Sequence, residues 1–129
     1  MELNFQDIMS FMDSYRNIQN KEMPLNVAFQ FSRFLNEAEK CISFYQDRYN
    51  SYLEQYAVKE QDGKFKMNED QTGIVLKEDS ISEAQQKFKE LYDYKFPITL
   101  EKIPMSSLKE LKLSPFTIKG LIPFIKENE

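Results

Sequence analysis

The chain has 129 residues, of which 41% are hydrophobic and 29% charged, a balance typical of one folded domain (residues 1–129) and not of a disordered segment. Its formal net charge of −4 argues against binding nucleic acid through clustered basic residues. A single cysteine excludes an intramolecular disulfide and no apolar run reaches the roughly 18–20 residues that span a bilayer, so we expect a protein of a reducing cytoplasm without a membrane span.

The predicted elements begin with an amphipathic helix over residues 4–18. Asn4 is a suitable N-cap, because its side chain accepts hydrogen bonds from the free N–H groups of a first turn. Apolar side chains then recur at steps of three and four residues, which predicts one buried helix face. This face comprises Phe5, Ile8, Met9, Met12, Tyr15 and Ile18.

A much longer helix is predicted over residues 25–57, where neither glycine nor proline interrupts the chain. Pro24 suits its first turn. An apolar stripe runs down one face, so we expect this helix to be the spine of the fold, packed on the first helix and on a second partner. The stripe comprises Val27, Phe31, Phe34, Ala38, Ile42, Tyr45, Tyr49, Tyr52 and Tyr56.

Residues 58–76 contain Asp62-Gly63, a pair typical of tight hairpin turns. The flanking residues are only weakly strand-like, so a short exposed β-hairpin and a mobile loop both remain open. The run Ile74-Val75-Leu76 is the better strand fragment.

A third helix is predicted from about Ser82 to residue 94, with Ser80 or Ser82 as its N-cap, because Ser82 and Gln85 have the spacing of a capping box. We expect it to pack antiparallel to the spine. Its inner face comprises Ala84, Phe88, Leu91 and Tyr92.

The alternation Phe96-x-Ile98-x-Leu100 then predicts a strand, which Pro97 places at a sheet edge or strand start. A short turn capped by Ser106 or Ser107 follows.

Ser114-Pro115 predicts the N-cap and first residue of a last helix. Pro123 breaks or kinks this helix and leaves Phe124-Ile125 to pack as an apolar tail. Together these elements predict an α+β fold that is predominantly helical: a long helical hairpin, a small β-hairpin or sheet element, and a C-terminal helical cap.

The amino-acid composition excludes most of the known kinds of catalytic site. Histidine is absent, which excludes Ser-His-Asp, Cys-His and His-metal sites, and three glycines are too few for a phosphate-binding loop. The pairs Glu69-Asp70 and Glu78-Asp79 are interpreted as solvated charges, and Cys41 as a buried core thiol. We therefore predict no catalytic residue, metal site or cofactor, and do not expect an enzyme.

The tyrosine ladder, which we define as Tyr45, Tyr49, Tyr52 and Tyr56 together with Arg48, is the most suggestive feature. Its rings could simply pack against the third helix with their hydroxyls at the surface. Part of the ladder could instead be a protein-binding face, because tyrosine and arginine are typical interface anchors. Base stacking is a third alternative, disfavoured by the acidic balance of this half of the chain.

Read in order, several short motifs resemble a family of small bacteriophage and prophage proteins of unassigned function. Early in the spine the matching residues are Leu25-x-Val27-Ala28-Phe29-x-Phe31-Ser32-x-Phe34-Leu35, followed by Arg48-Tyr49-x-x-Tyr52-x-x-x-Tyr56. The later motifs are Asp62-Gly63-Lys64, Phe88-x-x-Leu91, Ile98-x-Leu100-x-x-Ile103 and Leu113-Ser114-Pro115-x-x-Ile118-x-x-Leu121-Ile122-Pro123-Phe124-Ile125. The resemblance covers most of the chain from about residue 24 onward; the aromatic spine departs from the pattern.

The resemblance implies a phage origin and nothing about catalysis. We expect a non-enzymatic phage protein that acts through protein–protein contact, either by self-association or by docking on another phage component. The alternative is an inhibitor of a host enzyme or antiviral defence factor. A nucleic-acid-binding accessory protein is the least favoured of the three hypotheses. The expected location is the cytoplasm of the infected bacterial host, or the virion.

Overall fold

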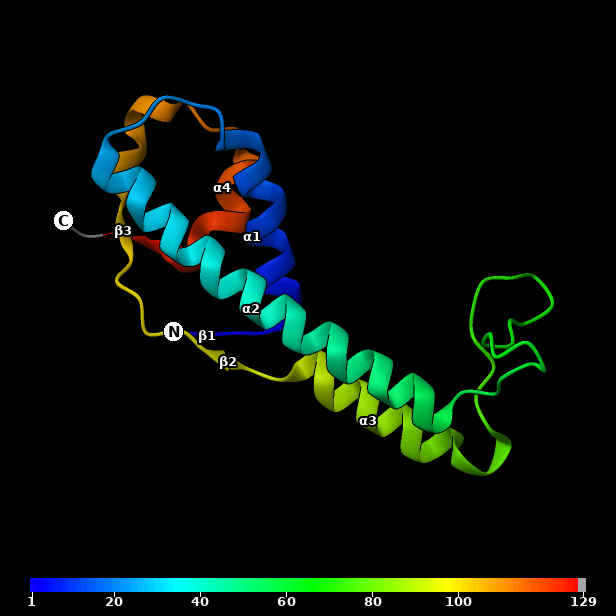
Figure 1. Cartoon of the computed structure of the whole chain (residues 1–129). Helices are drawn as coiled ribbons and strands as arrows, with labels where there is room; N and C mark the ends of the chain where they lie inside the picture. Colours follow the sequence, from blue (N-terminus) through cyan, green and yellow to red (C-terminus); the bar gives the residue numbers. More distant parts are fainter. Residues whose placement is uncertain (128–129) are drawn as a thin grey trace. The chain divides into compact units, whose positions relative to one another are not determined.

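The computed structural model describes residues 1–127 and has the predicted α+β fold, predominantly helical (Figure 1). Over these residues the α-helices are α1 (Phe5–Ile18), α2 (Leu25–Tyr56), α3 (Ile81–Asp93) and α4 (Pro115–Leu121). The short 3-10 helices are η1 (Glu78–Ser80), η2 (Met105–Leu111) and η3 (Ile122–Phe124). The chain divides into two compact units, the first comprising Met1–Ser43 and Tyr94–Glu129 and the second Phe44–Asp93; α2 runs through both.

The start of α1 confirms the predicted cap, because Asn4 and Asp7 form a capping box. The N–H of Asp7 donates to Oδ1 of Asn4 over 2.9 Å, and the N–H of Asn4 donates to Oδ2 of Asp7 over 3.0 Å. Two backbone donors at the helix start are thereby satisfied. The long spine helix is confirmed as α2, which ends at Tyr56.

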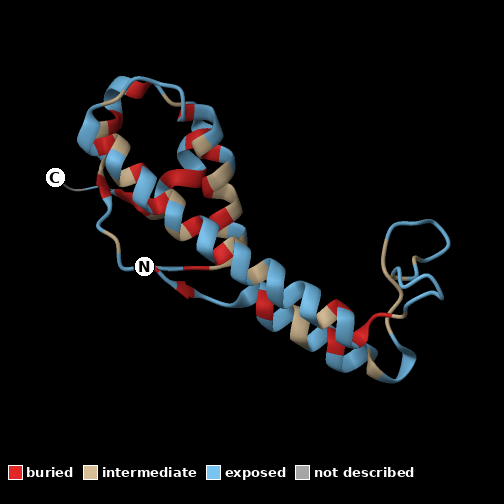
Figure 2. Ribbon diagram, viewed as in Figure 1, coloured by how far each residue is buried: buried red, intermediate tan, exposed pale blue. Residues whose placement is uncertain are grey.

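The core of the first unit is built on phenylalanine rings from three elements. The ring centroids of Phe11 and Phe34 lie 6.4 Å apart, and that of Phe124 lies 4.5 Å from Phe11 and 4.6 Å from Phe34. Figure 2 shows buried residues in red along α1, α4 and the first part of α2. The predicted inner face of α1 is wrong in one respect: it omits Phe11, which is 0% exposed, whereas the included Met12 and Tyr15 are partly buried and pack against the core.

This face is shifted because α4 crosses α1 at Ser14, a polar residue that is only 1% exposed. A Cβ atom on Gly120 would lie 2.1 Å from Oγ of Ser14 and 2.4 Å from the carbonyl oxygen of Ser10. A residue without a side chain is therefore required at position 120 for the two helices to approach this closely. The buried row of α1 consequently runs through Phe11 and Ser14 and leaves Met12 at its margin.

The last helix forms as the sequence predicts. The N–H of Thr117 donates to Oγ of Ser114 over 3.2 Å, and Pro115 is the first helical residue. Pro123 lies in η3, where the α-helix has ended, and the apolar tail Phe124-Ile125 is buried.

Four strands of two residues each form two small sheets within residues 1–127: β1 (Glu2–Leu3) lies antiparallel to β2 (Phe96–Pro97), and β3 (Ile103–Pro104) lies parallel to β4 (Ile125–Lys126). The predicted strand over residues 96–100 is therefore too long. The N–H of Ile98 still donates to the carbonyl of Met1 over 2.7 Å, but Leu100 lies outside the ladder. The ladder itself pairs only Glu2 with Pro97 and Leu3 with Phe96.

Two predicted helix starts are wrong by one or two residues. α3 begins at Ile81, so of the two predicted caps Ser80 directly precedes the helix, as the last residue of η1, and Ser82 lies inside its first turn. η2 begins at Met105, ahead of the predicted caps Ser106 and Ser107. In each case a preceding element, η1 or β3, runs directly into the helix, so the start is set by the incoming backbone and not by a separate capping side chain.

In the second unit, α3 packs beside the C-terminal part of α2 (Figure 1). The ring of Tyr52 contacts Phe88, and one turn further along α2 the side chain of Tyr56 bonds to Glu83. Later residues of α2 thus meet earlier residues of α3, which confirms the predicted antiparallel packing.

Residues 57–77 complete the second unit. They contain three short extended segments, which we together call the β element. The N–H of Val58 donates to the carbonyl of Val75 over 2.9 Å, that of Val75 to Lys66 over 2.8 Å, and that of Lys66 to Val58 over 2.8 Å. These three hydrogen bonds form a closed triangle. The antiparallel bridge between Lys59 and Phe65, with Gly63 at φ +86° between them, gives hairpin-like pairing; the extended residues of 57–77 form isolated bridges and no named strand.

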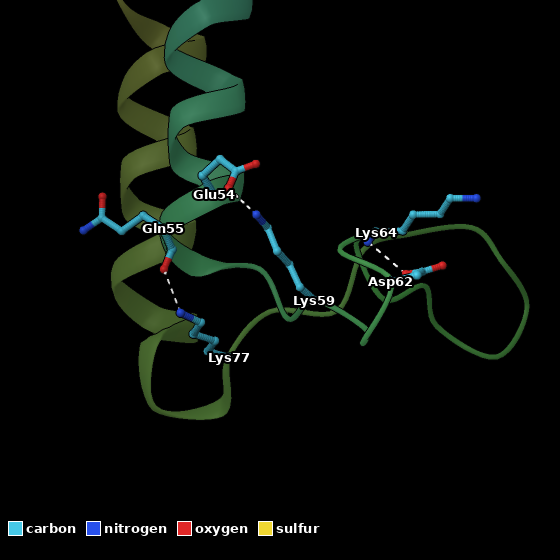
Figure 3. A network of polar contacts seen from close by, with 6 residues as sticks. All are labelled: Glu54, Gln55, Lys59, Asp62, Lys64 and Lys77. Carbon is cyan, nitrogen blue, oxygen red and sulfur yellow. Dashed lines mark hydrogen bonds and ion pairs between the residues drawn. The ribbon is translucent and has the colours of Figure 1, made fainter.

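Side chains tie this β element to the end of α2 (Figure 3). Lys59 forms an ion pair with Glu54, and Nζ of Lys77 donates to the carbonyl oxygen of Gln55 over 3.3 Å. The second of these bonds satisfies a carbonyl in the last turn of α2, which has no partner within the helix.

Candidate protein-interaction site

The tyrosine ladder lies entirely in the second unit, on the α2 residues that face α3. Its members differ in burial. Tyr56 is 3% exposed, Tyr45 and Tyr52 are partly buried, and Tyr49 is 39% exposed. Arg48 is exposed. The ladder is therefore neither wholly core nor wholly surface, and its two ends have different roles.

Tyr56 is part of the structural core of this unit. Its hydroxyl donates a hydrogen bond to the Glu83 carboxylate, and its carbonyl accepts one from the N–H of Lys77 over 2.8 Å. Burial first, and then the neighbouring Glu83 carboxylate, raise the pKa of the Tyr56 phenol, while nearby Lys87 opposes the shift. Tyr56 thus joins α2, α3 and the β element.

In the middle of the ladder, Tyr52 is held between a ring and a cation. Phe88 meets it in a T-shaped contact, with centroids 5.7 Å apart and planes at 83°. The Arg48 guanidinium lies 5.4 Å from the centroid of Tyr52, and Nη2 of Arg48 donates to its hydroxyl over 3.5 Å. Arg48 therefore presents a positive charge that is fixed in position by an aromatic face.

At the exposed end, Tyr45 and Tyr49 stack at 6.2 Å with an interplanar angle of 18°. Tyr49 also tilts onto Phe88, with ring centroids 5.1 Å apart. Burial raises the pKa of the Tyr45 phenol, with smaller contributions from Tyr49 and Tyr92. These contacts hold the partly exposed Tyr49 ring in a defined position.

Tyr49 also lines a pocket of about 430 Å³ within the second unit, which we call the Tyr49 pocket. Its lining residues are Tyr49 and Leu53 from α2, Phe88 from α3, and Met67, Thr72, Gly73, Ile74 and Leu76 from the β element. None of them carries a carboxylate, amine or guanidinium group. Its accessible lining is nevertheless about as polar as it is apolar, so the pocket suits an uncharged side chain that combines apolar surface with a hydrogen-bonding group.

The sequence predicts only the helical half of this pocket. Tyr49 is among the predicted site residues, and Phe88 is assigned to the inner face of α3. The sequence does not predict Met67 and Thr72 as lining residues, because it does not determine how residues 58–76 pair. The strand-like run around Ile74 is the one signal that could have found this side.

The carboxylate pairs considered as alternatives are exposed and do not line this pocket, although Asp70 is bonded to Thr72, one of its lining residues. The Asp70 carboxylate accepts hydrogen bonds from Oγ1 of Thr72 over 2.7 Å and from its N–H over 3.3 Å, which lower the pKa of Asp70. Within residues 1–127, no group of three or more Asp, Glu or Cys side chains is placed to hold a metal ion. Cys41 is buried as predicted, and burial followed by the Glu37 charge raises the pKa of its thiol.

Over the described part of the chain, none of the helices combines the length and the apolar character needed to cross a membrane. Comparisons with protein-family models, curated proteins and solved structures found no match to this chain.

Proposed function

We propose that this chain is a non-enzymatic bacteriophage protein that acts through protein–protein contact, by assembling with itself or by docking on another phage component. The Tyr49 pocket and Arg48, which packs on Tyr52 of the same helix, form the contact surface. The observation that carries this proposal is the partly exposed Tyr49 ring at the edge of an uncharged pocket of about 430 Å³.

Energetics favour this surface as a binding site. Tyrosine and arginine contribute disproportionately to interface affinity, particularly next to a pocket that a partner side chain can fill. Tyr49 is already held by Tyr45 and Phe88, and Arg48 by Tyr52, so little side-chain entropy remains to be lost on binding. A preorganised aromatic ring at a pocket, on the same stretch of helix as an exposed arginine, is typical of an interface anchor.

The proposal is tested by capturing partners from lysates of infected and uninfected host cells with the tagged protein, read by mass spectrometry. Recovery of phage proteins, or of the chain itself as an oligomer, supports the proposal. Retention of one host protein from both lysates supports the alternative, an inhibitor of a host enzyme or defence factor. Retention of nucleic acid with no protein, and with an affinity that falls steeply with salt, contradicts both.

A further inference from the structure

A second groove lies in the first unit, where η2, α4 and β4 meet. Its volume is about 220 Å³, and we call it the lysine-rimmed groove. Its lining residues are Met105, Leu108, Lys109, Lys112, Leu113, Ile118 and Ile125. It shares no residue with the Tyr49 pocket.

The groove has an apolar floor and apolar walls. Leu108 and Ile125 are 6% and 9% exposed and form its base, whereas Met105 and Ile118 are 48% and 40% exposed. An occupant that covers Met105 and Ile118 would remove apolar surface from water, which favours binding.

The charged side chains that line the groove are both positive. Lys109 and Lys112 lie three residues apart on a 3-10 helix and its C-cap, so they lie along the same side of it. Neither lysine takes part in an ion pair among residues 1–127, and no carboxylate lines the groove. Lys112 adopts a left-handed conformation with φ 51°, which few non-glycine residues adopt. Two unneutralised positive charges thus border an apolar groove.

We propose that the lysine-rimmed groove docks an acidic, amphipathic segment of a partner protein. One apolar side chain of that segment occupies the groove, and carboxylates beside it pair with Lys109 and Lys112. Charge complementarity selects such a segment over a basic or neutral one. A concave apolar groove fits a protruding side chain better than it fits a phosphate backbone or the flat surface of an anionic bilayer.

The test uses a fluorescein-labelled synthetic peptide with leucine at every third or fourth position and glutamate and alanine between. Fluorescence anisotropy measures its affinity for the whole chain and for two pairs of variants. The Lys109→Glu/Lys112→Glu variant is matched by Lys95→Glu/Lys102→Glu, which changes the same charge at exposed lysines outside the groove. Ile118→Ser is matched by Ile122→Ser, an exposed isoleucine (54%) that does not line it.

The expected result is saturable binding that weakens about tenfold in Lys109→Glu/Lys112→Glu and about fivefold in Ile118→Ser, and is nearly unchanged in the matched controls. Raising the salt concentration should weaken binding to the unmodified protein. Absence of saturable binding, or equal losses in groove and control variants, overturns the proposal. Binding to phosphatidylglycerol vesicles or to single-stranded DNA in place of the peptide also overturns it, in favour of a membrane or nucleic-acid ligand.

Discussion

The rings of Phe88 and Tyr52 form a T-shaped contact, with planes at 83° and centroids 5.7 Å apart, and this contact joins α3 to the middle of the tyrosine ladder. Phe88 also contacts Tyr49 and lines the Tyr49 pocket. One phenylalanine therefore supports both the packing of the second unit and the surface proposed to bind a partner.

Replacing Tyr52 by alanine should destabilise the fold by about 1–3 kcal/mol, because the variant loses a partly buried ring and leaves Phe88 without its edge contact. Urea denaturation of Tyr52→Ala, Phe88→Ala and the double variant should show a coupling of about 0.5–1.5 kcal/mol. Additive losses would mean that the ring contact contributes nothing of its own. Tyr52→Phe, which keeps the ring, should be close to neutral.

Gly120→Ala should destabilise the first unit, because the new Cβ atom would overlap Oγ of Ser14 and the carbonyl oxygen of Ser10. The expected loss is about 1–3 kcal/mol, although alanine is the better helix former. Gly73→Ala is the matched control, because its Cβ would lie 3.4 Å from its nearest neighbour, a side-chain atom of Asn68. Equal melting temperatures for the two variants would contradict the close approach of α1 and α4 at Gly120.

The hydroxyl of Tyr56 should make stability depend on alkaline pH. Its pKa is raised above the ordinary tyrosine value of about 10, so the neutral phenol stabilises the fold below that pH. This contribution is lost as the pH rises through the folded-state pKa. Urea midpoints measured between about pH 8 and pH 11 should therefore fall less for Tyr56→Phe than for the unmodified chain. Tyr94→Phe, at an exposed tyrosine, controls for loss of a hydroxyl; identical pH profiles for all three proteins would contradict the assignment.

Cys41 should react slowly with a thiol reagent in the folded protein. It is 7% exposed and its pKa is raised by burial, so both access and the thiolate fraction are low. We expect the reaction with Ellman's reagent to be at least about tenfold slower than in concentrated urea. A native rate equal to the unfolded rate would place the thiol on the surface.

The helices are predictable from sequence because their signals are local. Asn4, Pro24 and Ser114-Pro115 mark helix starts with side-chain or ring geometry that acts within one turn. The apolar stripe of α2 is equally local, since every member lies within a few residues of the next.

What escapes prediction depends on contacts between distant residues. The ring of Phe11 packs against Phe124, more than a hundred positions later in the chain, so its burial carries no local signal. The triangle of hydrogen bonds among Val58, Lys66 and Val75 is made by the backbone, which carries no sequence signal of its own. The Tyr49 pocket is half predicted for the same reason: its helical wall is periodic, and its other wall is built by that β element.

The most direct test of the proposed function compares partner affinity with stability in Arg48→Ala. Arg48 is exposed and contacts only the face of Tyr52 among the ring contacts described, so its loss should leave the melting temperature within about 2 °C of the unmodified chain. Arg16→Ala, at an exposed arginine of the first unit, is the matched control. With the partner recovered from infected lysate, we expect Arg48→Ala to bind about tenfold or more weakly and Arg16→Ala to bind normally. Equal affinity for both variants at unchanged stability would contradict the assignment of the ladder as the contact surface.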